Sequence, residues 1–323
     1  MEVYYLNKTS NDFGIGTSYS KLILIGEHSV VYGKPAIALP FPTIEAKSEV
    51  FGMNGPIMME SPYYSGLLSE IPDMLIGISA CILETCKVLN KPQEGFLIRI
   101  SSSIPIGRGL GSSAALAIAI VRSLFSFYKL PIDEKLLMHL VHNAEKYAHG
   151  NPSGIDMFAA SSEHPIWFQK KKPIIPLHIQ DPFYVVVGDS GRVGDTRTAV
   201  ESIREKYIAE PSRTENSINL LELYTYKAKE ALLIGDATTL GEMMNLAQKE
   251  LVLLGVSDQG IDYLVDVALQ EGALGAKLTG GGRGGCIIAL ANSIEHARIV
   301  SKQLKKAGAN QTWYFQIGLD RGE

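Results

Sequence analysis

Apolar residues recur along the chain with two spacings, and the spacing predicts which segments are strands and which are helices. Short apolar runs bounded by glycine, proline or polar residues are typical of strands, and apolar residues three or four positions apart are typical of helices. In the first half we predict strands at residues 22–25, 34–39, 43–51 and 95–101, and helices at residues 71–89 and 114–128. A third helix is predicted to begin after Asp133 and to carry Glu145 at its far end.

The second half has a different pattern, because long helical periods dominate it. We predict helices at residues 198–208, 216–233, 237–253, 260–270 and 293–307, with strands at residues 183–187, 275–279, 286–290 and 312–319. The change from a strand-rich to a helix-rich half puts a boundary near residue 181, and a length of 323 residues fits two domains of about 150 residues each. The predicted fold class is α+β, with domains 1–181 and 182–323 facing a common cleft.

The composition excludes several classes of protein. Hydrophobic residues make up 46% of the chain and charged residues 20%, which is typical of a globular protein. The net charge is −4 and the longest basic run, residues 170–172, is interpreted as a solvated turn, so we expect no nucleic-acid partner. Neither a secretory signal nor an uninterrupted apolar stretch of membrane length is found, so we expect no membrane association. Cys81, Cys86 and Cys286 lack the spacing of a zinc site or a disulfide framework, which favours a reducing, cytoplasmic location.

A glycine-rich loop leads directly into the helix predicted at residues 114–128. Gly107, Gly109 and Gly111 alternate, so the backbone can take positive φ values and point its N–H groups at an anion. Ser112 and Ser113 follow as candidate N-caps. An anion there would also meet the positive end of the helix dipole, which predicts a phosphate-binding loop. The alternative is an ordinary loop and cap without a ligand.

A second glycine-rich loop lies between the strands predicted at residues 275–279 and 286–290. Gly280, Gly282 and Gly285 match the dinucleotide pattern G-x-G-x-x-G, but a strand follows instead of a helix. We therefore interpret the loop as a tight turn whose backbone closely approaches another element or a ligand. Two such loops favour a nucleotide held between two domains. The usual P-loop and the protein-kinase motifs are missing, so phosphoryl transfer would need a third architecture.

Ionisable residues stand where strands or helices give way to turns. Glu27 and His28 follow the strand at residues 22–25, a place where side chains often face a cleft, although a surface turn is the plainer interpretation. Asp156 follows the turn at residues 149–154, which is dense in glycine, proline, asparagine and serine. It would be held there by a stiff loop, or would simply favour the start of a short helix.

Three of these segments together resemble the signature blocks of the GHMP small-molecule kinase superfamily. They are residues 21–33, 105–116 and 277–286, in the order of the family. Within the superfamily, residues 26–33 and 149–156 are similar to the blocks of the mevalonate kinase family. The resemblance implies an S5-like N-terminal domain, a ferredoxin-like C-terminal domain and a homodimer.

The resemblance also implies an activity and a set of site residues. The activity is ATP-dependent phosphorylation of the 5-hydroxyl of (R)-mevalonate, with mevalonate as small-molecule substrate, Asp156 as base or orienting residue and Lys21 beside it. Mg²⁺ would be held by Ser112 and Glu145. Glu145 lies 11 residues before Asp156, which is the spacing found in the family. The residues implied to bind ATP are Pro105, Gly107, Arg108, Gly109, Leu110, Gly111, Ser112, Ser113 and Ala114. Those implied to bind the substrate are Glu27, His28, Thr196, Gly280 and Gly281.

The chain departs from the family pattern at a few positions. Gly281 stands where the last block usually has alanine, and Arg283 replaces a glycine, so that its side chain would touch phosphate or face solvent. Met157 follows Asp156 where asparagine is frequent. Two other functions are alternatives: a sister kinase acting on another small alcohol, and a ligand sensor built on a kinase fold. A sensor could dispense with Lys21, Glu145 and Asp156, all of which are present.

Overall fold

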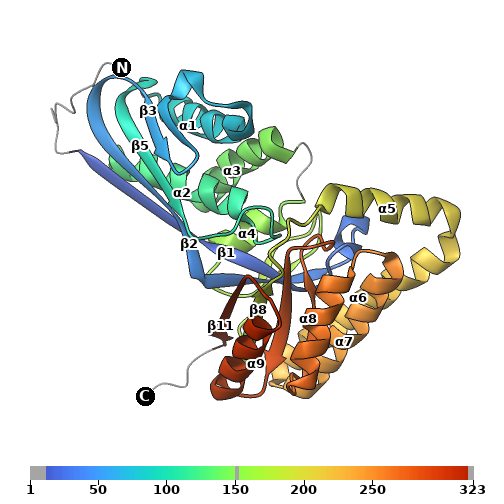
Figure 1. Ribbon diagram of the computed structural model, residues 1–323. Helices are drawn as coiled ribbons and strands as arrows, with labels where there is room; N and C mark the ends of the chain where they lie inside the picture. Colours follow the sequence, from blue (N-terminus) through green and yellow to red (C-terminus); the bar gives the residue numbers. More distant parts are fainter. Residues whose placement is uncertain (1–11, 150–152, 319–323) are drawn as a thin grey trace. The chain divides into compact units, whose positions relative to one another are not determined.

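A computed structural model describes residues 12–149 and 153–318 and divides them between two compact units (Figure 1). The first unit consists of residues 12–20, 44–104, 111–149 and 153–161. The second consists of residues 21–43, 105–110 and 162–318. Strands β1 (Phe13–Ile25) and β2 (Ala36–Pro56) each contribute residues to both units, so neither unit is one continuous segment.

The first unit consists of a group of paired strands and a group of helices. Four of its strands are ordered β4-β3-β5-β2, and β1 also pairs with β2. In the ordered set β3 is parallel to β5, whereas β4 and β3, and β5 and β2, are antiparallel. The helices α1, α2 and α3 contact one another, and Figure 1 shows them gathered beside these strands. The bounds are β3 (Met58–Ser61), β4 (Tyr64–Leu67), β5 (Glu94–Ser102), α1 (Ile76–Val88), α2 (Ser112–Phe127), α3 (Glu134–His149) and α4 (Ile155–Ser161).

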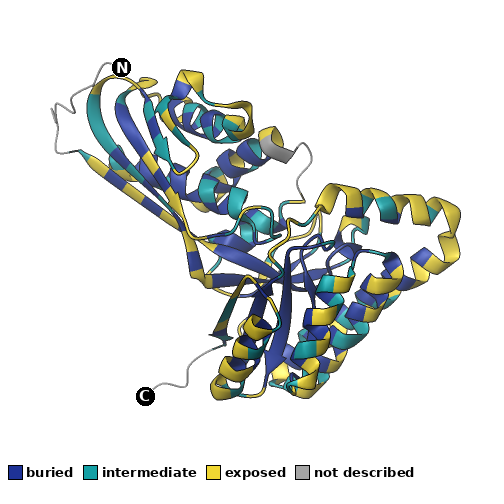
Figure 2. Ribbon diagram, viewed as in Figure 1, coloured by how far each residue is buried: buried dark blue, intermediate teal, exposed yellow. Residues whose placement is uncertain are grey.

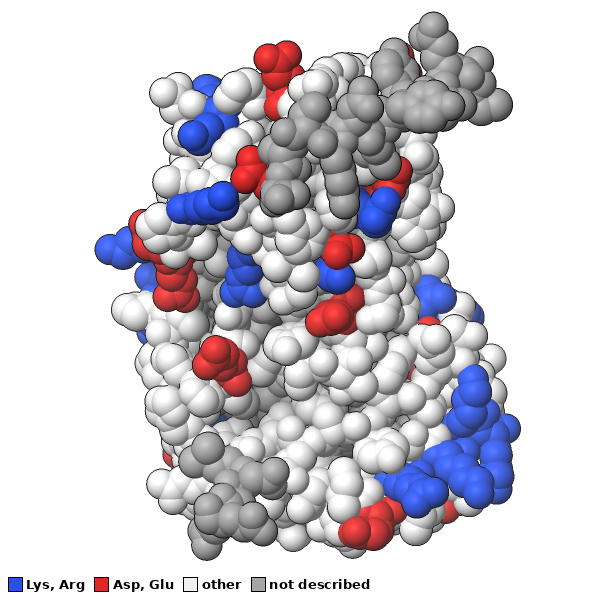
Figure 3. All heavy atoms as spheres, turned by 90° about the vertical axis from the view of Figure 1, so that its left-hand side faces the viewer, with Lys and Arg blue, Asp and Glu red and all other residues white. Residues whose placement is uncertain are grey.

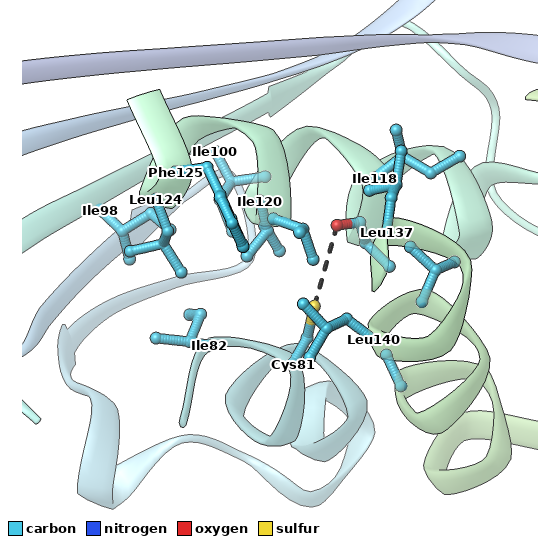
Figure 4. Close-up of a cluster of buried hydrophobic side chains, with 14 of the residues drawn as sticks. Cys81, Ile82, Ile98, Ile100, Ile118, Ile120, Leu124, Phe125, Leu137 and Leu140 are labelled. Atoms are coloured by element: carbon cyan, nitrogen blue, oxygen red, sulfur yellow. Dashed lines mark hydrogen bonds between the residues drawn. The ribbon is translucent and has the colours of Figure 1, made fainter. Parts of the chain in front are cut away.

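An apolar core joins the strands and helices of the first unit (Figure 4). Ile98 and Ile100 of β5 lie among side chains of α2, while Cys81 of α1 donates a hydrogen bond to the carbonyl of Ala117, with Sγ 3.8 Å from the oxygen. Burial raises the pKa of the Cys81 thiol to about 12, so that it behaves as a small apolar group. All three cysteines are buried and free.

The second unit is built on a four-stranded antiparallel sheet ordered β11-β8-β10-β9. Helices α8 and α9 pack on its strands and α7 packs on β9 and on α6. Figure 2 shows that the central strands are buried, whereas α5 is largely exposed. The bounds are β8 (Phe183–Asp189), β9 (Gly275–Thr279), β10 (Cys286–Ala291), β11 (Gln311–Ile317), α5 (Thr196–Ala209), α6 (Pro211–Ile234), α7 (Ala237–Leu254), α8 (Gln259–Gln270) and α9 (Ile294–Lys306). Two short strands, β6 (Ile166–Phe168) and β7 (Ile175–Pro176), pair beside the start of β2.

Side chains of α7 form hydrogen bonds with backbone groups along the outer edge of β9. The amide of Asn245 accepts a hydrogen bond from the backbone N–H of Ala276 at 2.9 Å, and Gln248 accepts one from Leu278 at 2.9 Å. A sheet edge with unpaired backbone groups is costly when it is buried, so these contacts replace a fifth strand. They fix the position of β9, which carries Lys277 and leads into the second glycine loop.

The α+β class and most of the elements expected from the sequence are confirmed, with two corrections. The strands predicted at residues 34–39 and 43–51 form the single strand β2, in which Pro40 and Pro42 lie between the residues that pair with β6 and those that pair with β5. The fixed φ of proline is compatible with an extended backbone, so the strand continues through both residues although neither donates a backbone hydrogen bond. Neither Ser112 nor Ser113 is the N-cap of α2: the helix begins at Ser112 and Gly111, at φ 70°, is its cap. The linear division at residue 181 stays a prediction.

The surface carries charges of both signs. On the face in Figure 3, acidic and basic side chains are mixed, with one group of basic side chains at the lower right. In the part of the chain that the structure describes, no helix is both long and apolar enough to cross a membrane.

Candidate active site

A strained turn at residues 27–29 follows the buried end of β1. His28 has φ 61° and ψ −48°, and the N–H of Ser29 donates to the carbonyl of Glu27 at 2.7 Å. This is a γ-turn of the rare form with positive φ, which a non-glycine residue adopts only when the surroundings enforce it. Glu27 and His28 are 1% and 5% exposed. The structure therefore replaces the surface turn considered from the sequence by a buried one.

Glu27 forms a fully buried ion pair with Lys277 of β9. The Lys277 ammonium donates to Oε1 of Glu27 and also to the carbonyl of Leu278 at 2.5 Å. Burial raises the pKa of Glu27 and lowers that of Lys277, and in each case the charge of the partner opposes the shift. Oε2 of Glu27 is buried and has no hydrogen-bond partner among the described residues.

His28 contacts the second glycine loop. Its Nε2 lies 3.1 Å from the carbonyl oxygen of Gly281, whereas its buried Nδ1 has no partner in the described part of the chain. Burial lowers the pKa of His28 to about 4, so the imidazole is neutral at pH 7. A carbonyl only accepts, so Nε2 carries the proton and Nδ1 is an acceptor.

The first glycine loop has the backbone that its sequence predicts. Gly107, Gly109 and Gly111 all have φ near 70°, and α2 follows immediately. The ammonium of Lys21 donates to the carbonyl of Gly109 at 2.9 Å, so a buried cation is attached to the loop. Amides in the first turn of a helix lack partners within the helix, which suits the loop to an anion.

The second glycine loop is packed tightly against protein. A Cβ on Gly282 would lie 2.0 Å from the carbonyl oxygen of Val256, and one on Gly281 would lie 2.1 Å from the hydroxyl oxygen of Thr196. Gly280 approaches the backbone of Gly109, so the two glycine loops lie against each other. The interpretation of a turn in close backbone approach is confirmed. Packing explains these glycines without a ligand.

Two arginines of the glycine loops are held by protein groups. The Arg108 guanidinium lies 2.8 Å from the buried carboxylate of Asp189 and donates to the carbonyl of Gly191 at 2.9 Å. Arg283 donates to the hydroxyl of Ser202 at 2.8 Å and to the carbonyl of Gly255 at 3.2 Å. Arg283 thus anchors its loop to neighbouring helices instead of facing solvent.

The first unit holds two acidic residues predicted for the site, Glu145 and Asp156. Ser113 donates a 2.5 Å hydrogen bond to Oε1 of Glu145, which is 5% exposed. Asp156 lies half-buried in the first turn of α4. Within residues 12–149 and 153–318 no cluster of three His, Cys, Asp or Glu side chains is arranged to hold a metal ion.

The predicted site residues are therefore distributed over both units. The second unit contains Pro105, Gly107, Arg108, Gly109, Leu110, Lys21, Glu27, His28, Thr196, Gly280 and Gly281. The first contains Gly111, Ser112, Ser113, Ala114, Glu145 and Asp156. The sequence interpretation missed Lys277, although a lysine in an apolar strand signals a buried charge that needs a partner. A cavity of about 280 Å³, lined by residues such as His164, His178 and Phe315, contains none of the predicted site residues.

Comparison with known proteins decides the family. Residues 78–163 match the GHMP kinases N terminal domain and residues 228–310 match the GHMP kinases C terminal domain. A mevalonate kinase of Thermococcus sibiricus is 32% identical, over 91% of this chain and 93% of its own. The chain belongs to the mevalonate kinase family of the GHMP kinases. A mevalonate kinase of Pyrococcus horikoshii is 33% identical over 91% of this chain and 92% of its own.

Solved structures agree with this family. The structure of L. major mevalonate kinase in complex with R-mevalonate has a TM-score of 0.83 and 26% identity, and the match covers 100% of both chains. The Methanococcus jannaschii mevalonate kinase has a TM-score of 0.81 and 25% identity over 96% of this chain and 99% of its own. The fold and family expected from the sequence are confirmed.

Proposed function

We propose that this chain transfers the γ-phosphoryl group of ATP to the 5-hydroxyl of (R)-mevalonate, giving 5-phosphomevalonate and ADP in the mevalonate route to isoprenoids. The observation that carries the proposal is the Glu27-His28 turn. It holds two neighbouring polar side chains, each with a buried atom that has no partner among the described residues. Membership of the mevalonate kinase family supports the choice of substrate.

ATP is assigned to the first glycine loop. Backbone N–H groups around Gly107 to Ser113 and the start of α2 are the anion-binding part, and Lys21 supplies a cation at Gly109. The Arg108 side chain contacts Asp189 and Gly191, and we assign its contribution to the backbone of the loop.

Mg²⁺ is assigned to Glu145 and the hydroxyl of Ser112. Mg²⁺ takes oxygen ligands and is usually held by one or two carboxylates together with substrate phosphates, so the donor set fits although no three-residue cluster is described. Ser113 binds one oxygen of Glu145 and thereby orients the carboxylate. When bound, the ion would neutralise charge on the β- and γ-phosphates.

Asp156 is assigned as the group that accepts the proton of the 5-hydroxyl or orients that hydroxyl for attack. Lys21 would stabilise charge that develops on the transferred phosphoryl group. Thr196, Gly280 and Gly281 would complete the acceptor side, where Gly281 already contacts both His28 and Thr196. A homodimer and a cytoplasmic location stay predictions.

The test is coupled ADP release with Mg-ATP and a panel of acceptors. The panel contains mevalonate, phosphomevalonate, galactose, homoserine and a control without acceptor. Turnover that is selective for mevalonate is expected. Faster turnover of another alcohol would retain the kinase assignment and overturn the acceptor, while ATP binding without turnover of any acceptor would favour a sensor.

A further inference from the structure

We propose that Lys277 is a positioning residue for acceptor recognition: it holds one oxygen of Glu27 so that the other accepts a hydrogen bond from a non-reacting hydroxyl of the substrate. For mevalonate this is the 3-hydroxyl, and the inference rests on the proposed function to that extent. Lys277 is assigned no contact with the reacting atoms.

The first argument is that the ion pair is built into the sheet. Lys277 pairs with Ile288 of β10 in the register of the sheet, and its side chain is 0% exposed. Thr279 fixes the same strand to β1, because its hydroxyl donates to the carbonyl of Ile23 at 2.9 Å and accepts from the N–H of Ile23 at 3.1 Å. The strand that carries Lys277 is thus tied to the strand that leads to Glu27.

The second argument is the direction of the remaining polar atoms. Lys277 binds Oε1 of Glu27, which leaves Oε2 as a buried acceptor. His28 presents Nδ1 as a second buried acceptor, because its Nε2 faces the carbonyl of Gly281. Two adjacent hydrogen-bond acceptors can accept from a hydroxyl group of the ligand. A ligand carboxylate has no hydrogen to donate to them. The turn is therefore suited to an alcohol group of the ligand.

The third argument is what happens to Glu27 without Lys277. An unpaired carboxylate is costly in a buried site, and it avoids that cost by taking up a proton. Glu27 would then be a carboxylic acid that also donates, and its fixed orientation would be lost. Loss of Lys277 is thus expected to weaken the binding of the alcohol substrate and not the binding of ATP.

The experiment compares Lys277→Met, Glu27→Gln and the double variant with wild type. Lys206→Met is the matched control, since Lys206 contacts the carbonyl of Leu253 away from the turn. Unfolding by urea, KM for the acceptor and KM for ATP are measured for each. Lys277→Met is expected to raise KM for mevalonate about 10- to 100-fold, the worth of a hydrogen bond to a charged group, and to leave KM for ATP unchanged.

The double variant separates positioning from stability. Its neutral pair is expected to recover resistance to urea while KM for mevalonate stays raised. A double variant that recovers both would overturn the proposal, and so would an equal rise in KM for ATP. If Lys277→Met does not fold, KM for mevalonate is compared between the double variant and Glu27→Gln. Equal values are expected because Lys277 acts through Glu27, and a further rise in the double variant would overturn the proposal.

A substrate analogue tests the hydroxyl directly. Wild type is expected to prefer mevalonate over 5-hydroxy-3-methylpentanoate, which lacks the 3-hydroxyl, and the double variant is expected to lose most of that preference. An unchanged preference would overturn the proposal. If the acceptor panel shows that another alcohol is the substrate, the proposed function fails, and the same KM ratios measured with that alcohol still decide the role of Lys277.

Discussion

Two buried glutamates, one in each unit, receive hydrogen bonds from different kinds of side chain. Glu27 is paired with the ammonium of Lys277, whereas Glu145 accepts a hydrogen bond from the neutral hydroxyl of Ser113. Both side chains are almost completely excluded from solvent, at 1% and 5% exposure. An ammonium cancels the charge of a carboxylate, and a hydroxyl orients a carboxylate while leaving its charge intact.

The difference teaches which ligand each glutamate suits. Glu27 belongs to a neutral pair with a spare acceptor, which suits a hydroxyl group. Glu145, which the Ser113 hydroxyl orients, is the carboxylate to which the proposed function assigns Mg²⁺. Burial alone would have ranked the two glutamates as equivalent, so the identity of the partner decides the chemistry.

The largest effect is expected at Asp156, the residue to which the proposed function assigns the reacting hydroxyl and which neither glutamate can replace if the two have the roles given above. Asp156→Asn keeps the shape of the side chain and removes the base, so kcat is expected to fall by about 10²–10⁴ with ATP affinity unchanged. Steady-state kinetics and ATP titration measure this. Asp133→Asn is the control, because Asp133 caps α3 through the N–H of Leu136 and asparagine also caps. Near-normal kcat in Asp156→Asn would exclude Asp156 as catalyst.

The next largest effect is expected in the free energy of unfolding. Its loss should be larger when the Glu27–Lys277 ion pair is broken than when the Ser113–Glu145 hydrogen bond is removed. Lys277→Met removes one partner of a buried ion pair and is expected to lower the free energy of unfolding by about 3–5 kcal/mol. Ser113→Ala removes a hydroxyl from a carboxylate and is expected to cost about 1–3 kcal/mol. Urea unfolding of both variants measures the contrast. Equal losses would remove the distinction between the two glutamates.

The pH dependence of stability tests the neutral state of His28. Burial lowers its pKa from 6.5 to about 4, so the unfolded chain takes up a proton at higher pH than the folded chain does. The free energy of unfolding that depends on a neutral His28 is therefore fully present above pH 6.5. It is lost as the pH falls toward 4, by at most about 3 kcal/mol. Urea unfolding from pH 7 to pH 4.5 is expected to show a shallower pH dependence in His28→Gln than in wild type. Parallel curves would contradict the burial argument.

The smallest effect is expected in the requirement for Mg²⁺. Glu145→Gln is expected to raise the half-saturating Mg²⁺ concentration about 10- to 100-fold, because a charged ligand is replaced by a neutral amide. Glu27→Gln, the same substitution in the ammonium-bound glutamate, is expected to leave it unchanged. Titration of activity with Mg²⁺ measures both. A similar shift in both variants would mean that the partner does not distinguish them.

Local sequence determined much of this protein. Helical and strand periods predicted α2, α7 and β9 because both periods are set by neighbouring residues. Alternating glycines predicted the positive φ values of the first loop. The motifs in three separated segments also indicated the kinase family, which the comparisons confirm.

Only the tertiary structure decided which buried groups meet. Glu27 and Lys277 are 250 positions apart, and no periodicity encodes the partner of a buried charge. The choice of Ser113 instead of Ser112 as donor to Glu145 depends on where α2 begins, because each residue turns the helix by about 100°. The glycines at 281 and 282 are explained by Thr196 and Val256, which only folding brings close. Local propensities are short-range, whereas the charge and contacts of the site come from residues that the fold assembles.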